Sequence, residues 1–378
     1  EIDIKELADL HPSTYVLVDI RDVISHDYGA MPHSISMPNI LEEELDKDKS
    51  YVLYCMKGIE SLDWARILRE KGYDCISLKG GYSAYLKSCL GKVDKDLNEK
   101  CEHSITTTYR KQLLSPFLKA IDTYQLIQEG DKIAVCISGG KDSMLMAKLF
   151  QALKRFSRIN FDVVFLIMDP GYSELNRLLI EENARNLNVP VEIFETRIFD
   201  IVYSQAKTPC YLCARMRRGH LYNQAKLLGC NKIALGHHYD DVIETILMGM
   251  MYGGQIQTMM PKLKSDNFEG MELIRPLYLI READIKNWRD YNGLHFIQCA
   301  CHFTDTCSSC REDGTSVSKR MEIKNLIKEL KKTNPYIEKL PTENNAYDKY
   351  GISRYIIAQP QIKTYSAAKG EDVKARVY

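Results

Sequence analysis

The stretch KIAVCISGGKDS, residues 132–143, decides the fold that this sequence predicts. Its first half is a continuous apolar run typical of a buried strand. Its second half places two glycines, Gly139 and Gly140, just before an expected helix, and Lys141 adds a positive charge. Glycines let the backbone approach an anion closely, and N–H groups at a helix N-terminus point towards its oxygens. We interpret the stretch as a phosphate-binding loop, although not of the Walker A spacing; a glycine-rich turn without a ligand is the alternative.

Strands and helices alternate after this loop. Apolar runs predict further strands, at residues 161–168, 191–195 and 232–235. Helices are expected from about Ser143, near residues 173–187 and from about Cys210. Strands that are apolar on both faces and alternate with helices indicate a doubly wound parallel sheet with helices on both sides. The fold class is therefore α/β.

The N-terminal segment predicts a second, smaller α/β unit. Its expected elements are strands at residues 15–20 and 51–54, a helix at 61–71 and a short strand before Gly81. A polar, charged stretch at residues 87–102 indicates a linker. Beyond about Pro341 the chain is polar and weakly periodic, with some order expected at residues 355–358. We therefore predict a domain at residues 1–90, a linker at 91–108, a second domain at 109–340 and a tail at 341–378.

Composition excludes several classes of protein. Hydrophobic residues make up 45% and charged residues 27% of the 378 residues, as in folded globular proteins, and the formal net charge is zero. A nucleic-acid partner therefore cannot be inferred from bulk charge. No apolar run approaches the roughly 20 residues of a membrane span, and the N-terminus has no signal-peptide pattern. We expect a cytoplasmic protein without membrane association.

The twelve cysteines are many for a chain of this size. A chain with this core composition has no need of a disulfide scaffold. Clusters of the form C-x-x-C and C-x-C indicate metal or sulfur chemistry in a reducing compartment. Three others, Cys75, Cys136 and Cys230, lie in or beside apolar segments, so we expect them to be core residues.

One cysteine pair, Cys210 and Cys213, stands at the start of an expected helix. Three arginines follow it, Arg215, Arg217 and Arg218. Positive charge and a helix N-terminus favour thiolate ligands. The pair alone fits zinc, an iron–sulfur cluster or a redox role.

The sequence GHHYDD, residues 236–241, follows the strand expected at residues 232–235. His237 and His238 are candidate metal ligands, but their place at a strand end favours a role at the nucleotide site. Asp240 and Asp241 are candidates for capping the next helix, which is compatible with contacts to Mg²⁺ or substrate.

In this setting, the SGGKDS motif resembles the PP-loop of the N-type ATP pyrophosphatases, which cleave ATP to AMP and pyrophosphate and adenylate a carbonyl oxygen. The resemblance implies that the loop holds the pyrophosphate part of ATP through Ser138, Gly139, Gly140, Lys141, Asp142 and Ser143. It also implies that Asp169 lies near the adenosine. We assign Gly236 and His237 to the same site, and Lys141 and Asp241 to catalysis with Mg²⁺.

Over most of residues 132–330 the chain resembles tRNA 2-thiocytidine synthetase and its thiouridine-forming relatives. The matching motifs are SGGKDS, PCxxCxxxRR, LGHHxDD, MxYGG, IRPL and a late cysteine. In that family three cysteines hold a 4Fe–4S cluster with one iron open to sulfide. By position these are Cys210, Cys213 and Cys299, with Cys301 as the alternative to Cys299. The remaining pair, Cys307 and Cys310, binds zinc with Cys301 or has a peripheral role.

The N-terminal segment resembles a rhodanese domain over about residues 1–90. It has the motif D-x-R at residues 19–21, G-x-x-P at 29–32, a cysteine loop that begins at Cys55, and L-x-G-G at 78–81. Cys55 is placed at a strand end to act as a persulfide carrier. Glu60 replaces the usual arginine of the loop, so we expect a protein persulfide, such as one from a cysteine desulfurase, rather than thiosulfate as donor. A catalytically inactive docking domain is the alternative.

The expected function is ATP-dependent thiolation of tRNA, with 2-thiocytidine as the expected product. Basic residues after the C-x-x-C, and a second set at residues 319–332, could follow a phosphate backbone, although the second set also fits a solvated helix face. Thiolation of another tRNA base or of a small molecule is one alternative. A non-catalytic ATP and iron–sulfur binding module is another. The resemblance also allows a homodimer.

Overall fold

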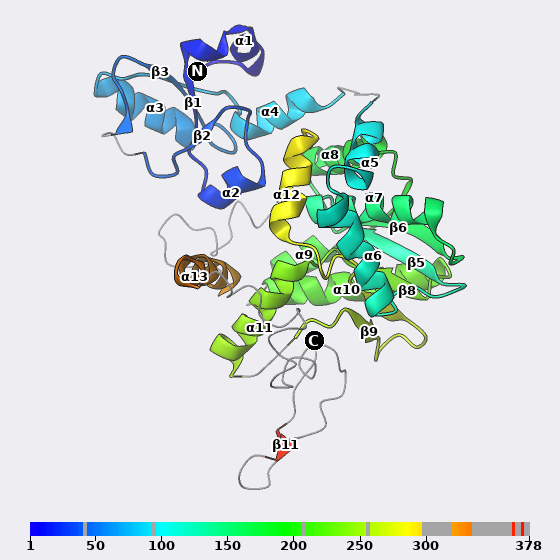
Figure 1. Cartoon of the computed structure of the whole chain (residues 1–378). Coiled ribbons are helices and arrows are strands. Elements are labelled where there is room, and N and C mark those ends of the chain that lie inside the picture. Colours follow the sequence, from blue (N-terminus) through cyan, green and yellow to red (C-terminus); the bar gives the residue numbers. More distant parts are fainter. Residues whose placement is uncertain are drawn as a thin grey trace. The chain divides into compact units, whose positions relative to one another are not determined.

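The computed structural model describes residues 1–40, 44–91, 96–205, 209–254, 258–296, 319–334, 365–366 and 372–373. The chain forms two compact units (Figure 1). The first holds Glu1–Lys95, Glu174–Asn183 and His295–Gln298. The second holds Asp96–Ser173, Ala184–Leu294 and Cys299–Tyr378.

A parallel sheet of order β2-β1-β3-β4 forms the centre of the first unit. Its strands are β1 (Val16–Asp19), β2 (Ile35–Ser36), β3 (Ser50–Tyr54) and β4 (Asp74–Ser77). Its helices include α1 (Ile4–Asp9), α2 (Val23–Tyr28), α3 (Glu60–Glu70) and α4 (Gly81–Cys89). Val18 and Leu53 pack into one core, whereas Leu17 and Val52 pack into another, because alternate residues of a strand point to opposite faces. The small α/β unit expected from the sequence is confirmed.

The second unit contains a six-stranded sheet of order β7-β6-β5-β8-β10-β9. Its strands are β5 (Lys132–Ile137), β6 (Asp162–Asp169), β7 (Val191–Glu195), β8 (Lys232–Ala234), β9 (Lys262–Lys264) and β10 (Glu272–Ile274). All neighbouring pairs are parallel except β9 with β10. The expected parallel sheet is therefore confirmed, with one antiparallel strand added at its edge. A short connection can join β9 to β10 only in the antiparallel sense.

Helices lie on both sides of this sheet (Figure 1). They include α5 (Leu97–Thr106), α6 (Ser115–Thr123), α7 (Lys141–Phe156), α9 (Ile198–Gln205), α10 (Pro209–Leu227), α11 (Tyr239–Gly253) and α12 (Glu282–Tyr291). Two further helices are α8 (Glu174–Asn186), most of which belongs to the first unit, and α13 (Lys319–Thr333), which packs against α11. Ala134 and Cys136 of β5 pack with Tyr222 of α10, and Ile133, Val135 and Ile137, which alternate with them along β5, are also buried. Both faces of the central strand are thus covered, as its continuous apolar sequence predicts.

Helix α5 occupies much of the stretch for which we expected a linker. Cys101 and Ile105 are buried on one face of the helix, and they are four residues apart. Glu102, on another face, binds Lys148 of α7 at 2.8 Å. The charged residues concealed a narrow apolar stripe, so this segment is a packed helix rather than a polar connection. Residues 355–358, where we expected some order in the tail, lie outside the described residues.

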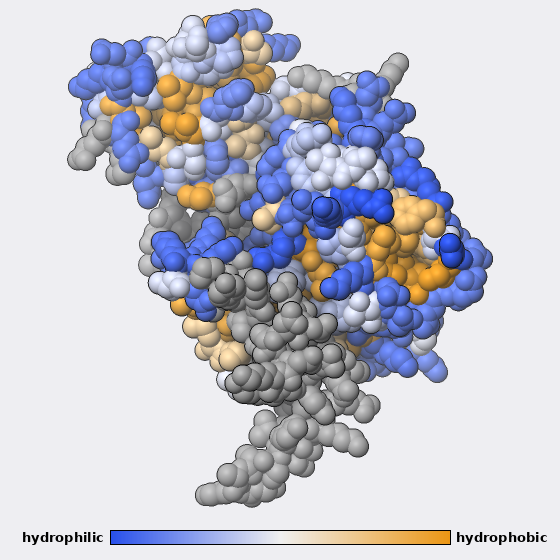
Figure 2. Space-filling view, viewed as in Figure 1, coloured by the Kyte–Doolittle hydropathy of each residue, from blue (hydrophilic) through white to orange (hydrophobic). Residues whose placement is uncertain are grey.

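The surface in Figure 2 is largely hydrophilic over the residues that the structure describes. An apolar patch lies at the end of α11, where Met250, Met251 and Tyr252 are exposed. Among the described helices, none is both long and apolar enough to cross a membrane.

Candidate functional site

The phosphate loop joins β5 to α7. Gly139 has a φ of +84°, a conformation that glycine adopts without strain. The Ser143 hydroxyl accepts a hydrogen bond from the Ser138 N–H at 3.2 Å and donates to the Gly140 carbonyl at 2.9 Å, which closes the loop on itself. The N-cap residue of α7, Gly140, has no side chain with which to cap the helix. An anion bound at this end would meet the N–H groups of the first helical turn.

Lys141 is buried beneath the loop, and two carboxylates hold its ammonium. Its Nζ lies 3.1 Å from Asp142 Oδ2 and 3.2 Å from Glu282 Oε1. Burial alone would raise the pKa of Glu282, but Lys141 and Lys324 bring it well below its ordinary value, so this carboxyl is ionised. Sequence reasoning missed Glu282, because a single glutamate at a helix start carries no motif.

The loop after β8 lies against the phosphate loop. A Cβ on Gly236 would come within 3.3 Å of the Ser143 nitrogen, so a larger residue would press on the loop backbone. His237 is half-buried, and its buried Nδ1 atom has no hydrogen-bond partner among the described residues. Burial, together with nearby Arg275, lowers the pKa of His237 to about 4. Its ring is therefore neutral at physiological pH.

His238 caps α11 and pairs with Asp241. The Asp241 N–H donates to His238 Nδ1 at 3.4 Å, and the His238 N–H donates to Asp241 Oδ2 at 3.0 Å. Asp241 thus belongs to a capping box, as one interpretation of the sequence held. Its Oδ1 lies 2.6 Å from the Arg320 guanidinium. Burial opposes ionisation, but His238, His237 and Arg320 lower the pKa of Asp241.

The carboxylates of Asp169 and Asp240 stabilise two loops through hydrogen bonds to backbone N–H groups. Asp169 Oδ1 accepts hydrogen bonds from the N–H groups of Gly171 at 2.8 Å and Tyr172 at 2.7 Å, which shapes the turn after β6. Asp240 binds Arg281 at 2.9 Å and accepts the N–H of Glu282 at 2.7 Å, which anchors the start of α12. The contact of Asp169 with adenosine stays a prediction.

The cysteine helix begins at the same edge of the sheet as the phosphate loop. Cys213 of α10 is half-buried and packs against a cluster that contains Met168, next to the end of β6. Since β5 and β6 are parallel neighbours, their carboxyl ends meet at one edge. The Cys210 side chain lies outside the described residues, as do all four late cysteines, Cys299, Cys301, Cys307 and Cys310.

Two thiols at positions i and i+3 of a helix suit a soft metal centre such as an iron–sulfur cluster. Within the described part of the chain, no three His, Cys, Asp or Glu side chains converge as metal ligands. The three other cysteines expected to be core residues are confirmed as such: Cys75, Cys136 and Cys230 are buried, and burial raises the pKa of each thiol.

In the first unit, Cys55 follows β3 directly and begins a tightly held loop. Its Sγ accepts the Gly58 N–H at 3.1 Å and the Ser61 hydroxyl at 3.5 Å. Its carbonyl accepts the Tyr82 N–H at 2.8 Å. A Cβ on Gly81 would lie 2.2 Å from that carbonyl oxygen. Glycine in the L-x-G-G motif therefore allows the backbone of this motif to contact the loop that begins at Cys55. The thiol is thus surrounded by hydrogen-bond donors.

The D-x-R motif has a structural task. Arg21 forms a buried ion pair with Asp19 at 2.6 Å and donates to the Gly29 carbonyl at 2.8 Å. The Tyr54 hydroxyl donates to the same Asp19 carboxylate at 2.9 Å. These contacts connect β1 and β3 to the loop after α2, and therefore fix the strand that ends at Cys55.

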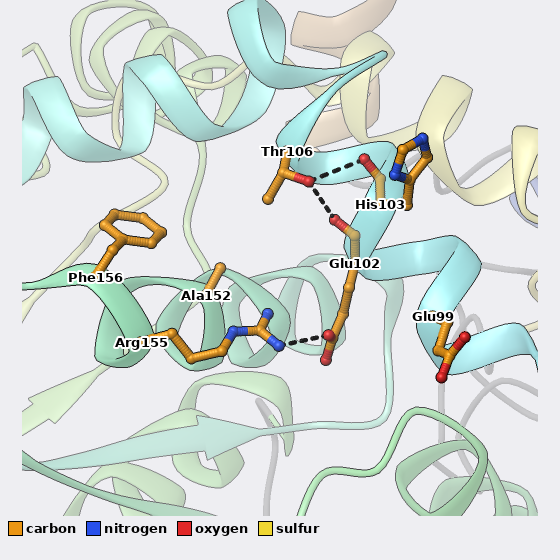
Figure 3. A pocket seen from close by; sticks show the side chains of 7 residues that line it. All are labelled: Glu99, Glu102, His103, Thr106, Ala152, Arg155 and Phe156. Atoms are coloured by element: carbon orange, nitrogen blue, oxygen red, sulfur yellow. Dashed lines mark hydrogen bonds and ion pairs between the residues drawn. The ribbon is translucent and has the colours of Figure 1, made fainter.

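A hollow of about 310 Å³ lies elsewhere in the second unit, between α5 and the C-terminal end of α7 (Figure 3). Arg155 reaches across it to Glu102, and Phe156 forms part of its rim. The phosphate loop is at the other end of α7, roughly 20 Å away at 1.5 Å per residue. We therefore assign no part of the nucleotide site to this hollow.

Comparison with known proteins matches both units. A PP-loop domain model matches residues 105–302, and a rhodanese-like domain model matches residues 3–88. A protein named tRNA-cytidine(32) 2-sulfurtransferase from Aeromonas salmonicida is 40% identical over 211 residues, which cover 54% of this chain and 68% of that protein. One of the same name from Vibrio cholerae is 43% identical over 187 residues, which cover 48% of this chain and 59% of that protein.

Among solved structures, the U34-tRNA thiolase NcsA from Methanococcus maripaludis with its [4Fe-4S] cluster aligns with a TM-score of 0.47 and 21% identity. The alignment covers 60% of this chain and 74% of that chain.

The sheet order, the uncapped glycine loop after its central strand and the lysine beneath it define a nucleotide-binding α/β protein. The PP-loop match covers more than half of the chain, so this chain belongs to the PP-loop domain family, and its N-terminal part is a rhodanese-like domain. The expected combination of these two domains is thereby confirmed.

Proposed function

We propose that this protein is a cytoplasmic, ATP-dependent tRNA sulfurtransferase that forms 2-thiocytidine. One observation carries the proposal: the phosphate loop and the start of the C-x-x-C helix lie at the same edge of one sheet. An enzyme that activates a base with ATP and then replaces its oxygen by sulfur needs these two functions side by side. The names of the relatives support tRNA as the substrate and cytidine as the base.

The described residues suit the activation step. The backbone of the loop at residues 138–143 and the first turn of α7 bind the pyrophosphate part of ATP. Lys141 neutralises charge that develops as the bond to the α-phosphorus breaks. Asp142 Oδ1 is buried without a hydrogen-bond partner among the described residues, and with Asp241 it would hold Mg²⁺. The C2 oxygen of the base attacks the α-phosphorus, pyrophosphate leaves, and the oxygen becomes part of an AMP leaving group.

Sulfur delivery rests on the cysteines. Cys210, Cys213 and Cys299 would hold a 4Fe–4S cluster, which when bound supplies an open iron for sulfide. The Cys55 thiolate of the rhodanese-like domain attacks the terminal sulfur of a donor persulfide, such as that of a cysteine desulfurase, and the donor cysteine leaves as a thiolate. A thiol reductant supplies the two electrons that release this sulfur from Cys55 as sulfide. On α10, the side chains of Arg215, Arg218 and His220 are exposed. They could contact tRNA phosphates through ion pairs or hydrogen bonds. Assembly as a homodimer is part of the same proposal.

The test is nucleoside mass spectrometry of tRNA from a strain that lacks this protein. We expect complete loss of 2-thiocytidine and its return when the wild-type chain is supplied. Loss of a different thionucleoside would show that the protein thiolates another base. An unchanged set of thionucleosides would contradict the proposal and favour a small-molecule substrate or a non-catalytic module.

The cluster makes a separate prediction. Protein purified without oxygen should be brown and contain about four irons and four acid-labile sulfides per chain. Cys213→Ala and Cys210→Ala should each abolish the chromophore, because the cluster loses one of three thiolates. Cys230→Ala is the matched control, since Cys230 is a buried core thiol. Stoichiometric zinc without labile sulfide would refute the cluster.

A further inference from the structure

Helix α13 contributes to the nucleotide site although it lies beyond the part of the chain that matches the PP-loop family. Lys324 Nζ lies 3.2 Å from Glu282 Oε2, while Lys141 Nζ lies 3.2 Å from Glu282 Oε1. One carboxylate therefore joins two ammonium groups, one at each oxygen. The first belongs to the phosphate loop and the second to α13.

The surroundings keep these charges in place. The side chains of Glu282 and Lys324 are 18% and 29% exposed, so solvent screens them only in part. Burial would lower the pKa of Lys324, but Glu282 and Glu244 raise it, and the ammonium stays charged. Glu244 Oε1 is 3.6 Å from the same Nζ. Four residues earlier, on the same face of α13, Arg320 holds Asp241.

This arrangement has a consequence for ATP binding. Nucleotide phosphates compete with Glu282 for the Lys141 ammonium. If Lys141 were the main counter-charge of Glu282, its movement towards phosphate would leave a half-buried carboxylate without compensation, which is unfavourable. With Lys324 on the other oxygen, Glu282 keeps a cation when Lys141 turns to the nucleotide.

We propose, on the basis of the function proposed above, that Lys324 is a positioning residue of the ATP site. It acts through Glu282, which it keeps neutralised and oriented so that Lys141 is available to the phosphates. α13 is therefore a part of the nucleotide site, and not only a solvated basic helix.

The experiment measures binding of a non-hydrolysable ATP analogue with Mg²⁺ by titration calorimetry to the full chain. We expect Lys324→Met to weaken binding about tenfold, which corresponds to about 1.4 kcal/mol. Lys324→Arg keeps the charge and should bind within about twofold of wild type, on the scale of surface substitutions. Lys328→Met, an exposed lysine one turn further along α13, should bind like wild type.

The double variant Glu282→Gln/Lys324→Met separates positioning from mere structural support. The introduced glutamine side chain would carry no charge to retain Lys141, so the double variant should bind more tightly than Lys324→Met alone. Additive weakening in the double variant, or wild-type binding by a Lys324→Met protein with an unchanged unfolding temperature, would overturn the inference. If Lys324→Met fails to fold, Lys324→Gln replaces it in both the single and the double variant. Absence of nucleotide binding by the wild type would instead refute the proposed function itself.

Discussion

Lys141→Ala is expected to lower the release of AMP and pyrophosphate, in the presence of tRNA and sulfide, by a factor of about 10² to 10³. The ammonium is buried beneath the phosphate loop, and two carboxylates hold it close by until it turns to the phosphates of the bound nucleotide. It is therefore in place before charge develops in the reaction. An electrostatic group fixed before the reaction needs no reorganisation during it. Alanine provides no replacement, because a water molecule carries no charge.

A matched control is Lys154→Ala on the same helix. Its side chain is 44% exposed and contacts Asp162, far along α7 from the loop. It should release AMP at the wild-type rate. The thermal unfolding of both variants is followed by circular dichroism, so that loss of fold is not mistaken for loss of chemistry. If folded Lys141→Ala still produces AMP at the wild-type rate, the SGGKDS loop is not the active site.

Cys55→Ser is expected to abolish tRNA thiolation when a cysteine desulfurase with cysteine supplies the sulfur, and to leave it unchanged with excess sulfide. The thiol accepts two hydrogen bonds in a loop after β3, where an arriving persulfide sulfur would receive the same donors. Because the two sulfur-handling domains share one chain, the effective concentration of the Cys55 persulfide at the proposed cluster is raised. It reaches the millimolar range for short flexible linkers. The serine variant should keep the iron–sulfur chromophore and nucleotide binding.

The concentration of thiol reductant decides whether this assay can detect the role of Cys55. Excess small thiol would free sulfide from the donor persulfide and bypass Cys55, so reductant is kept near stoichiometric levels. Cys89→Ser, which changes another thiol of the same domain at the end of α4, should behave like wild type with both sources. Equal activity of Cys55→Ser and wild type with the desulfurase would refute the relay. Loss of activity with both sources would assign Cys55 a different task.

Features with strong local signals could be predicted from the sequence. A strand that is apolar on both faces, followed by two glycines and a lysine, sufficed for β5, the phosphate loop and α7. The apolar run of β3 likewise predicted that a loop begins at Cys55. Such local patterns specify backbone geometry directly, so that no knowledge of distant contacts is needed.

Contacts between distant segments could not be predicted. Glu282 and Lys324 show ordinary charges at helical positions, and their relation to Lys141 exists only after α7, α12 and α13 pack together. The helix in the expected linker was missed because most of its residues are polar, although Cys101 and Ile105 bury one face. The hydrogen bonds by which Asp169 shapes the turn after β6 were likewise not foreseen, and its contact with the nucleotide stays a prediction.

The burial of Cys55 restricts which molecules can exchange sulfur with it. The residue is only 4% exposed, and hydrogen bonds from Tyr82 and Ser83 to the carbonyls of Cys55 and Met56 fix the loop backbone. A flat protein surface cannot reach a recessed thiol, whereas a persulfide at the tip of a narrow, extended segment can. We expect exchange to select partners by shape: short persulfides and protruding cysteine loops react quickly, and cysteines on rigid, flat surfaces react slowly whatever their intrinsic nucleophilicity.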